Sequence, residues 1–219
     1  MSDDSIKTKD KIAPLPTIRR IPSYLRLLYE YRKEGREWIS ATDIAERLSL
    51  KPIQVRKDMA FTGITGKPKK GFVVSDLIDS IRGFLGWDMM SDTVIVGSGA
   101  LGSALIGYSG FSEHGLNIIG AFDNDEAKIG SLIHGHKVYD LKDIASVIKD
   151  NDVTIGIITV PAQAAQSVAD KLVEAGIKGI WNFSPVKLRV PECVIVEKED
   201  LSSGLAVLSV KLGAHLCTD

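Results

Sequence analysis

The sequence predicts an α/β protein of two domains. We expect an N-terminal winged helix-turn-helix domain, followed by a Rossmann-like, doubly wound parallel sheet with a terminal swapped helix. Three observations predict this fold. The first 86 residues are basic, a strand–glycine turn–helix motif follows only at residues 94–102, and apolar strands then alternate with helical segments.

Charge divides the chain unevenly. Residues 1–86 hold 17 Lys+Arg against 11 Asp+Glu, whereas residues 87–219 hold 10 against 17. A basic first half joined to an acidic second half indicates a polyanionic partner for the first half alone.

The N-terminal region predicts a tail and three successive helices. Residues 1–16 form a polar, flexible tail, and residues 17–86 form the DNA-binding domain. Apolar side chains from Ile18 onward recur at helical spacing and end near Gly35. Ser40, an N-cap with Asp43 three residues later, begins a second helix. Pro52 suits the first position of a third helix over residues 52–61.

A glycine-rich loop completes this domain. Residues 63–71 carry three lysines and precede an apolar run at 72–74, which predicts a hairpin wing, and a further helix follows over residues 76–85. A helix-turn-helix with a wing predicts binding of double-stranded DNA. The expected DNA contacts are Gln54 as a base reader, Arg56 and Lys57 in the major groove or on phosphates, and Lys67, Lys69 and Lys70 along the backbone or minor groove. The alternative is a helical oligomerisation or capping piece with a solvated charged face.

Residues 87–198 predict the Rossmann domain. Six strands are expected at 93–97, 116–122, 136–139, 153–159, 178–183 and 193–197. Near-continuous apolar strands such as 155–158 indicate a parallel sheet that is covered on both faces.

The glycine motif predicts a dinucleotide site. It consists of Gly97, Ser98, Gly99, Ala100, Leu101 and Gly102. This layout places a pyrophosphate at a helix N-terminus. Asp123, at the end of the next strand, is expected to bind the adenosine ribose hydroxyls. The acidic residues at 123–126 would repel a 2′-phosphate, so we expect NAD, as NADH and NAD+, rather than NADP. The alternative is that Asp123 only caps a strand end.

Two later strand ends are expected to line the nicotinamide. The fourth strand ends at Thr159, Val160 and Pro161, and the fifth at Asn182, Phe183, Ser184 and Pro185. Ligands bind at the carboxyl ends of strands in open α/β sheets. The alternative is that both prolines only terminate strands.

The remaining residues argue against an enzyme. Residues 198–219 are too few for a substrate domain, and none of His114, His134, His136 and His215 is expected at a strand end beside an acid or base. His134 and His136 are expected in an exposed, glycine-containing loop. A nicotinamide site without a proton relay predicts a sensor.

The expected cellular location is inferred from targeting and membrane-spanning signals that the sequence does not contain. Cys193 and Cys217 do not have the spacing of a metal site, the acidic N-terminus is no signal peptide, and no apolar run is long enough to span a membrane. We expect a cytoplasmic protein without metal or membrane contact.

Residues 199–219 predict a dimerisation helix. Leu201, Leu205, Leu208 and Leu212 fall on one stripe. The helix either packs on its own sheet or is donated to a partner subunit. Donation is favoured, because helix-turn-helix readers usually act as symmetric dimers. A homodimer is therefore expected.

Between residues 18 and 212 the chain resembles the Rex family of bacterial redox-sensing transcriptional repressors. The motifs that carry the resemblance are residues 24–28 (YLRLL), 54–58 (QVRKD), 97–102 (GSGALG), 121–125 (AFDND), 158–162 (ITVPA) and 179–186 (GIWNFSPV). The resemblance implies a homodimer with exchanged C-terminal helices. It also implies that the protein binds palindromic operator DNA when NADH is scarce and leaves it when NADH binds. Tyr108 and Asp200 resemble the family's switch pair, with Arg20 a third member and Leu201 approaching the nicotinamide from the partner.

Some residues depart from the family pattern. The family's wing usually reads Gly-Lys-Arg-Gly-Val-Gly-Tyr, whereas residues 66–72 read Gly-Lys-Pro-Lys-Lys-Gly-Phe, so the minor-groove arginine is absent. Trp181 and Ser184 replace a usual leucine and alanine. Three alternatives therefore stay open: a small NAD-dependent oxidoreductase with a helical cap, a CoA-binding Rossmann module, and a paralogue that no longer recognises DNA.

Overall fold

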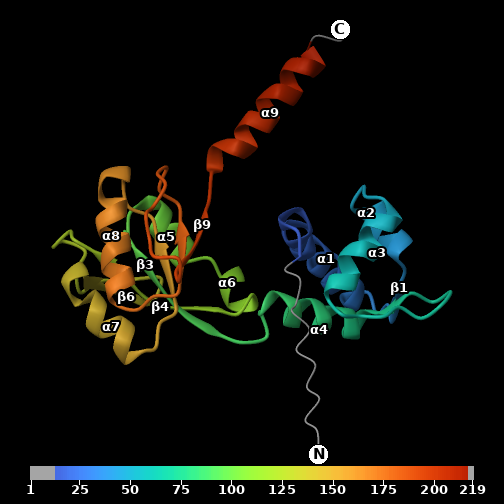
Figure 1. Ribbon diagram of the computed structural model, residues 1–219, viewed down its shortest axis with the longest axis horizontal. Coiled ribbons are helices and arrows are strands. Elements are labelled where there is room, and N and C mark those ends of the chain that lie inside the picture. The colour runs from blue at the N-terminus through green and yellow to red at the C-terminus, as the bar shows by residue number, and fades with distance from the viewer. Residues whose placement is uncertain (1–12, 217–219) are drawn as a thin grey trace, which may run out of the picture. The chain divides into compact units, whose positions relative to one another are not determined.

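The computed structural model describes residues 13–216 (Figure 1). Residues 1–12 of the expected tail and Cys217 lie outside the described residues. The chain divides between Asp88 and Met89 into two compact units, each of which is described by itself. Within residues 13–216, no helix combines the length and apolar character needed to cross a bilayer.

The first unit contains four helices and a two-stranded antiparallel sheet among its described residues. The elements are α1 (Leu15–Lys33), β1 (Trp38–Ile39), α2 (Ala41–Arg47), α3 (Pro52–Phe61), β2 (Phe72–Val73) and α4 (Val74–Leu85). Helix α1 begins three residues before the predicted start and takes in the end of the expected tail, because prolines at 14 and 16 preset the backbone of a first helical turn. The capping box at Ser40 is confirmed, and Pro52 opens α3 as predicted.

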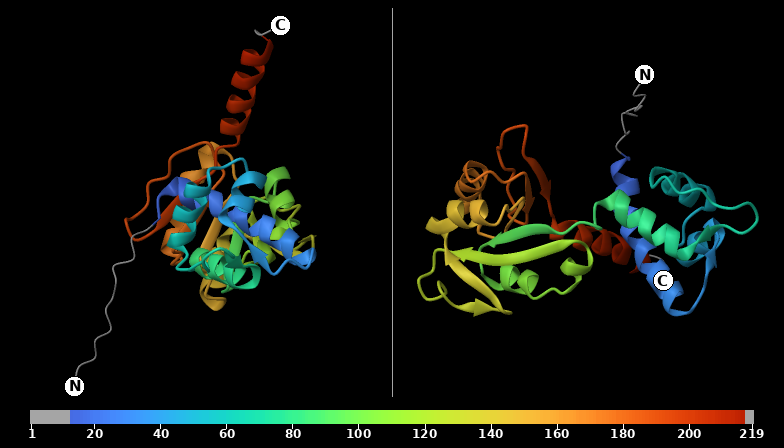
Figure 2. Two further views of the ribbon diagram at one scale, coloured as in Figure 1. Left: turned by 90° about the vertical axis from the view of Figure 1, so that its right-hand side faces the viewer. Right: turned by 90° about the horizontal axis from the view of Figure 1, so that it is seen from below.

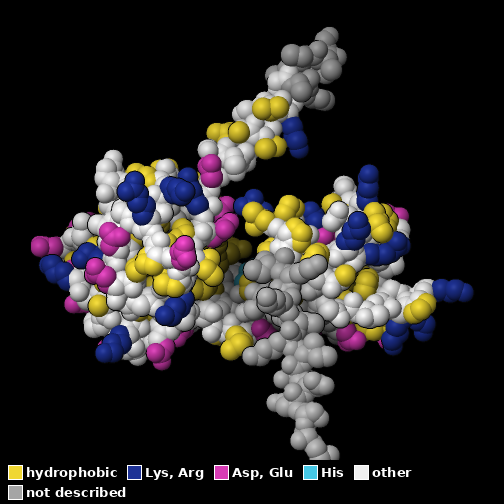
Figure 3. Space-filling model, viewed as in Figure 1, with side chains coloured by type: hydrophobic (Ala, Val, Ile, Leu, Met, Phe, Trp, Pro, Cys, Tyr) yellow, Lys and Arg dark blue, Asp and Glu magenta, His cyan; other side chains and the backbone are white. Residues whose placement is uncertain are grey.

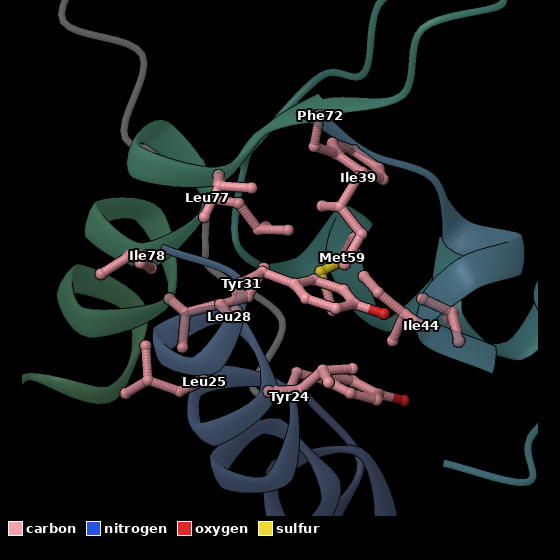
Figure 4. Packing of buried hydrophobic residues seen from close by; sticks show 14 of the residues in the cluster. Tyr24, Leu25, Leu28, Tyr31, Ile39, Ile44, Met59, Phe72, Leu77 and Ile78 are labelled. Carbon is pink, nitrogen blue, oxygen red and sulfur yellow. The ribbon is translucent and has the colours of Figure 1, made fainter. Parts of the chain in front are cut away.

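One apolar cluster holds the first unit together. Side chains of α1 point toward those of α2, α3 and β2 (Figure 4). Tyr24, Leu28, Ile44, Met59 and Leu77 are all almost fully buried within it. Trp87, expected in the linker, packs partly buried against the same cluster. The core therefore fixes α3 against α1 and leaves one face of α3 outside.

The wing is a short hairpin between α3 and α4. The Lys67 amide donates to the Gly71 carbonyl over 2.7 Å, and Lys69 at the turn has a φ of 62°. Gly71 has a φ of 88°, and a side chain there would overlap the Ile39 carbonyl. Glycine at this position therefore lets the wing return closely along β1.

The second unit is built on a seven-stranded sheet in the order β5-β6-β4-β3-β7-β8-β9. The strands are β3 (Ser91–Val96), β4 (Leu116–Asp123), β5 (Leu132–Ile133), β6 (His136–Asp140), β7 (Ile155–Ile158), β8 (Gly179–Asn182) and β9 (Ile195–Lys198). All pairs are parallel except β5 with β6. Within this unit the chain begins at the central strand β3, adds β4 to β6 on one side and then β7 to β9 on the other. The direction in which strands are added therefore reverses between β3 and β7.

Strand β5 was not predicted. His134 and Gly135 have φ values of 48° and 87°, and this two-residue turn pairs β5 with β6 as a hairpin. The strand expected from residue 136 is confirmed as β6, so the other expectation, of a loop that holds both histidines, is wrong for His136.

Helices cover both faces of the sheet (Figures 1 and 2). Alternate residues of one strand enter different clusters: Val94 and Val96 pack with α7 (Ile144–Asp150), which follows the short η1 (Leu141–Asp143), and with α8 (Ala162–Glu174). Ile95 packs instead on the side of α5 (Ala100–Ile106) and α6 (Gly110–Glu113). This alternation explains why the strand is apolar throughout.

The last helix, α9 (Leu201–Leu216), leaves its apolar side chains outside the core. Every residue from 201 to 213 is exposed, including Leu205 at 65% and Val210 at 73%. Yellow apolar side chains are visible along its surface in Figure 3. Packing of this helix on its own sheet, one of the two expected alternatives, is not observed for residues 201–213.

Candidate functional site

The glycine turn lies at the carboxyl end of β3. Gly97 has a φ of 99°, and a Cβ on it would lie 2.9 Å from Val160 Cγ1. A Cβ on Gly102 would overlap the Gly97 carbonyl, so neither position accepts a side chain. Gly99 is exposed and has nothing within 4 Å of its missing Cβ. The turn is thus tight at both ends and open in the middle, where a pyrophosphate would approach the backbone.

Asp123 closes the same edge at the end of β4. Its Oδ2 accepts hydrogen bonds from the Ser98 amide at 3.0 Å, from Ser98 Oγ at 2.6 Å and from Lys128 Nζ at 3.0 Å. Burial raises the pKa of Asp123, but the hydrogen bonds from Ser98 and Lys128 outweigh it and lower the pKa to about 2. The carboxylate is therefore ionised and rigidly placed. Lys128 was not singled out in the sequence, and its only signal was a position five residues after Asp123.

The ends of β7 and β8 join this edge through two hydroxyl groups. Thr159 Oγ1 lies 2.6 Å from the Gly97 carbonyl, to which it donates, and Ser184 Oγ donates to the Val160 carbonyl at 2.5 Å. The predicted strand-end loops are therefore brought together beside the glycine turn. The strand order β4-β3-β7-β8 places these loops at one edge of the sheet, because neighbouring parallel strands end on the same side.

Not all of the expected nicotinamide-lining side chains face solvent. Asn182 is buried; its Nδ2 donates to the Val186 carbonyl, and its Oδ1 accepts from the Ser184 amide, both at 2.9 Å. Asn182 therefore shapes the loop from within. Pro161 and Pro185 are exposed, and Phe183 is half-buried beside Trp181, with ring centroids 4.9 Å apart.

The expected switch residues of the second unit stand at its surface. Tyr108 is 53% exposed, and its ring meets Phe111 edge-on at 5.0 Å. Asp200 precedes α9 and accepts hydrogen bonds from the Ser202 hydroxyl and amide, which lower its pKa. Leu201 is exposed.

Arg20 lies in the first unit and is engaged there. Its Nε donates to Asp58 Oδ2 at 2.8 Å and its Nη2 to Asp58 Oδ1 at 2.9 Å. Tyr24 and Thr17 donate to the same carboxylate, which is fully buried. Burial raises the pKa of Asp58, but the hydrogen bonds, that of Arg20 first, hold it below its usual value. Asp58 thus ties α1 to α3, a role that sequence reasoning missed because its partners are distant in the chain.

The faces of α3 separate core from surface. Val55, Asp58 and Met59 are buried, and Arg56 and Lys57 are exposed as predicted. Gln54 differs from the prediction, because a base reader must point outward from the helix and Gln54 is half-buried. Its Nε2 donates to Asp58 Oδ1 at 2.9 Å. Asp58 lies four residues further along the same helix, and its ionised carboxylate can only accept hydrogen bonds, so it draws the amide N–H of Gln54 toward it.

A groove of about 520 Å³ separates α3 from the wing. Its lining includes Arg56 and Ala60 of α3 and Lys67 and Lys69 of the wing. Lys67 and Lys70 place their ammonium groups 5.0 Å and 5.3 Å from the Trp38 ring, within cation–π range. Lys and Arg side chains gather over this end of the unit in Figure 3.

Comparison with known proteins gives two family models and many full-length relatives. Residues 12–60 match a model described as "Putative DNA-binding protein N-terminus", and residues 88–186 match one described as "CoA binding domain". A redox-sensing transcriptional repressor Rex of Treponema denticola is 50% identical over 204 residues, covering 93% of this chain and 97% of that protein.

The chain belongs to the Rex family of redox-sensing transcriptional repressors. A crystal structure of RSP, a Rex-family repressor, in complex with β-NAD+ and operator DNA has a TM-score of 0.88 and 36% identity, covering 94% of this chain and 95% of that one. RSP in complex with β-NADH has a TM-score of 0.85 and 35% identity, covering 94% and 97%. Membership confirms the predicted resemblance and the predicted fold of a DNA-binding region followed by a parallel Rossmann-like sheet and a C-terminal helix. It also confirms a repressor rather than an enzyme. The exchange of the terminal helix between subunits stays a prediction.

Proposed function

We propose that this Rex-family chain represses transcription by binding palindromic operator DNA and is released when NADH binds. One observation carries the proposal: almost the whole chain superimposes on RSP, which is known in complex with β-NAD+ and operator DNA and with β-NADH. The basic first unit and the open glycine turn of the second unit support the same division of labour.

The cofactor would lie along the carboxyl edge of the sheet. The proposed contacts are Gly97, Ser98, Gly99, Ala100, Leu101 and Gly102 at the pyrophosphate, Asp123 at the adenosine ribose, and Thr159, Val160, Pro161, Phe183 and Pro185 at the nicotinamide end. Asn182 and Ser184 hold that end in shape. The ionised Asp123 accepts hydrogen bonds, as a ribose diol requires.

The operator would be held by α3 and the wing. Arg56 and Lys57 are exposed and would contact phosphates or base edges. Lys67 and Lys69 line the groove, and Lys70 lies in the wing beside it. Each charge that neutralises a phosphate makes binding fall with added salt.

The molecule that NADH releases from the operator would be a homodimer located in the cytoplasm. The exposed apolar face of α9 supports a homodimer in which this helix is donated to the partner. Such a dimer would have one arrangement in which its two α3 helices fit successive major grooves and another in which they do not. NADH can shift the population toward the second arrangement only by binding it more tightly than the first. Tyr108, Asp200, Leu201 and Arg20 are the proposed switch residues.

The test is DNA binding under controlled cofactor. Genomic fragments are titrated with the full chain in a gel shift, first alone, then with NAD+, NADH or CoA. We expect selective binding that NADH abolishes and NAD+ leaves intact. Binding to no fragment in any cofactor state would overturn the proposal, and release by CoA alone would favour the CoA-binding alternative that the second family model raises.

The variant Asp123→Ala tests the division of labour. It removes the proposed ribose contact, so NADH should release the operator only at a concentration at least tenfold higher, on the order of one charge-assisted hydrogen bond. Binding without NADH should not change. Loss of both properties together would contradict separate reading and sensing units.

A further inference from the structure

The first turn of α3 presents an apolar side chain to solvent. Ile53 is 55% exposed, although it follows directly after the helix start at Pro52. Residues three, four and seven positions further along share its face, and these are Arg56, Lys57 and Ala60, all exposed. Ile53 therefore belongs to the outward face of the helix, with two cations beside it.

The neighbouring hydrogen-bonding side chain is turned elsewhere. Gln54 is the only residue of α3 with a side-chain amide, and its nitrogen is directed at the buried Asp58. Arg56 lines the groove toward the wing. Ile53 is thus the residue of the first turn whose side chain is exposed on the outward face.

Position and chemistry together define what Ile53 would meet. In helix-turn-helix proteins the N-terminal residues of the recognition helix reach the base edges in the major groove. Among the four bases, only thymine carries an apolar group on that edge, the C5 methyl group. Contact between the two groups removes apolar surface of both from water.

We propose that Ile53 reads a thymine in each operator half-site by packing against its 5-methyl group. This inference rests on the proposed function, because it requires α3 to enter the major groove. It makes Ile53 a residue that determines sequence specificity, beside Arg56 and Lys57, which supply positive charge for phosphates or base edges.

The test removes single methyl groups from the DNA. The operator found by gel shift is synthesised with deoxyuridine in place of thymidine at one symmetric pair of positions at a time, and affinity is measured by fluorescence anisotropy without NADH. At one pair we expect a loss of about fourfold for each methyl group, or roughly fifteenfold for the two half-sites, as burial of one carbon predicts.

The variant Ile53→Ala should bind the thymidine operator more weakly and lose the difference between thymidine and deoxyuridine at that pair. The matched control is Leu15→Ala, which shortens an apolar side chain on α1 that is 51% exposed, and it should keep the difference. Because Ile53 is exposed, the thermal midpoint of the variant should equal that of the parent.

Two results would overturn the inference while leaving the proposed function intact. They are selective operator binding by the parent with no sensitivity to any methyl group, and a sensitivity that Ile53→Ala retains in full. A parent chain that binds no fragment selectively would overturn both proposals.

Discussion

At Asp123, two neighbouring groups define the environment that a ribose would meet. Lys128 Nζ lies 3.0 Å from Asp123 Oδ2 and 3.8 Å from Asp125 Oδ2. The acidic run after β4 was interpreted as repelling a 2′-phosphate, but Lys128 offsets part of that negative charge. If the carboxylates repel a 2′-phosphate as predicted, Lys128 would weaken that repulsion.

The first prediction concerns Lys128→Ala. Removing the ammonium group should lower affinity for NADPH about fivefold more than affinity for NADH, as expected from about 1 kcal/mol for a partly exposed charge pair. Fluorescence titration with both nucleotides measures the ratio. Lys142→Ala is the control, because Lys142 pairs with Asp140 on another strand. An unchanged ratio would show that Lys128 has no part in nucleotide choice.

A second prediction concerns pH. The pKa of Asp123 is about 2 in the folded chain against 3.8 for the free group, so its ionisation stabilises the second unit above pH 4, and this stabilisation is lost as pH falls toward 2. The contribution is about 2 kcal/mol. Urea unfolding followed by Trp181 fluorescence, in a chain with Trp38 and Trp87 replaced by Phe, measures it.

The control for this pH effect is Asp123→Asn, which cannot ionise. The difference in unfolding free energy between parent and variant should shrink by about 2 kcal/mol from pH 5 to pH 2. A difference that stays constant over this range would mean that Asp123 keeps no depressed pKa in the folded chain.

At the scale of elements, the three lysines of the wing lie in different environments. Lys67 and Lys70 stack on Trp38 of β1, whereas Lys69 sits at the turn with a left-handed backbone. The aromatic ring therefore positions two of the charges, and the turn presents the third. This arrangement retains cations in the wing without the arginine that is usual in the family.

The third prediction separates these lysines. Lys69→Asn removes the charge while keeping a residue that tolerates positive φ. Its operator affinity should fall, and the slope of log affinity against log salt should drop by about 0.9 for each subunit. Lys67→Gln, the comparison, should reduce the slope less because Lys67 is held over Trp38. Equal slopes for both variants would reject this division.

At the scale of the whole molecule, the proposed function requires two subunits to act together. Helix α9 exposes its leucines and valines along residues 201–213, and contiguous exposed apolar side chains mark interaction surfaces. A partner that covers this face would bring two copies of α3 to one duplex, about 34 Å apart along its axis.

The fourth prediction tests that assembly. Leu205→Glu places a charge on the exposed apolar face and should convert the dimer to a monomer, measured by light scattering after gel filtration. Operator affinity should fall with it, because one reading helix then binds alone. Ser203→Glu adds the same charge at an exposed polar position two residues before Leu205, on the opposite side of the helix, and should stay dimeric. A Leu205→Glu chain of unchanged mass would refute dimerisation through α9.

Much of the architecture follows from local sequence signals. The capping box at Ser40, Pro52 at a helix start and the spacing from Gly97 to Gly102 each impose a backbone geometry that depends on a few neighbouring residues. Apolar periodicity located the central strands for the same reason, since side-chain direction alternates along any strand. The two-residue strand β5 was missed because so short a segment shows no periodicity.

The sequence by itself determined the two-part organisation, the glycine turn with Asp123 at its side, and the basic face of α3. Only the tertiary structure decided that Gln54 turns to Asp58, that Lys128 pairs with Asp123, and that Thr159 bonds to Gly97. The bond from Thr159 to Gly97 joins groups that packing brings together from distant parts of the chain. The pairs Gln54–Asp58 and Lys128–Asp123 are only four and five residues apart, but they too depend on the fold, because the fold buries both carboxylates while they stay ionised.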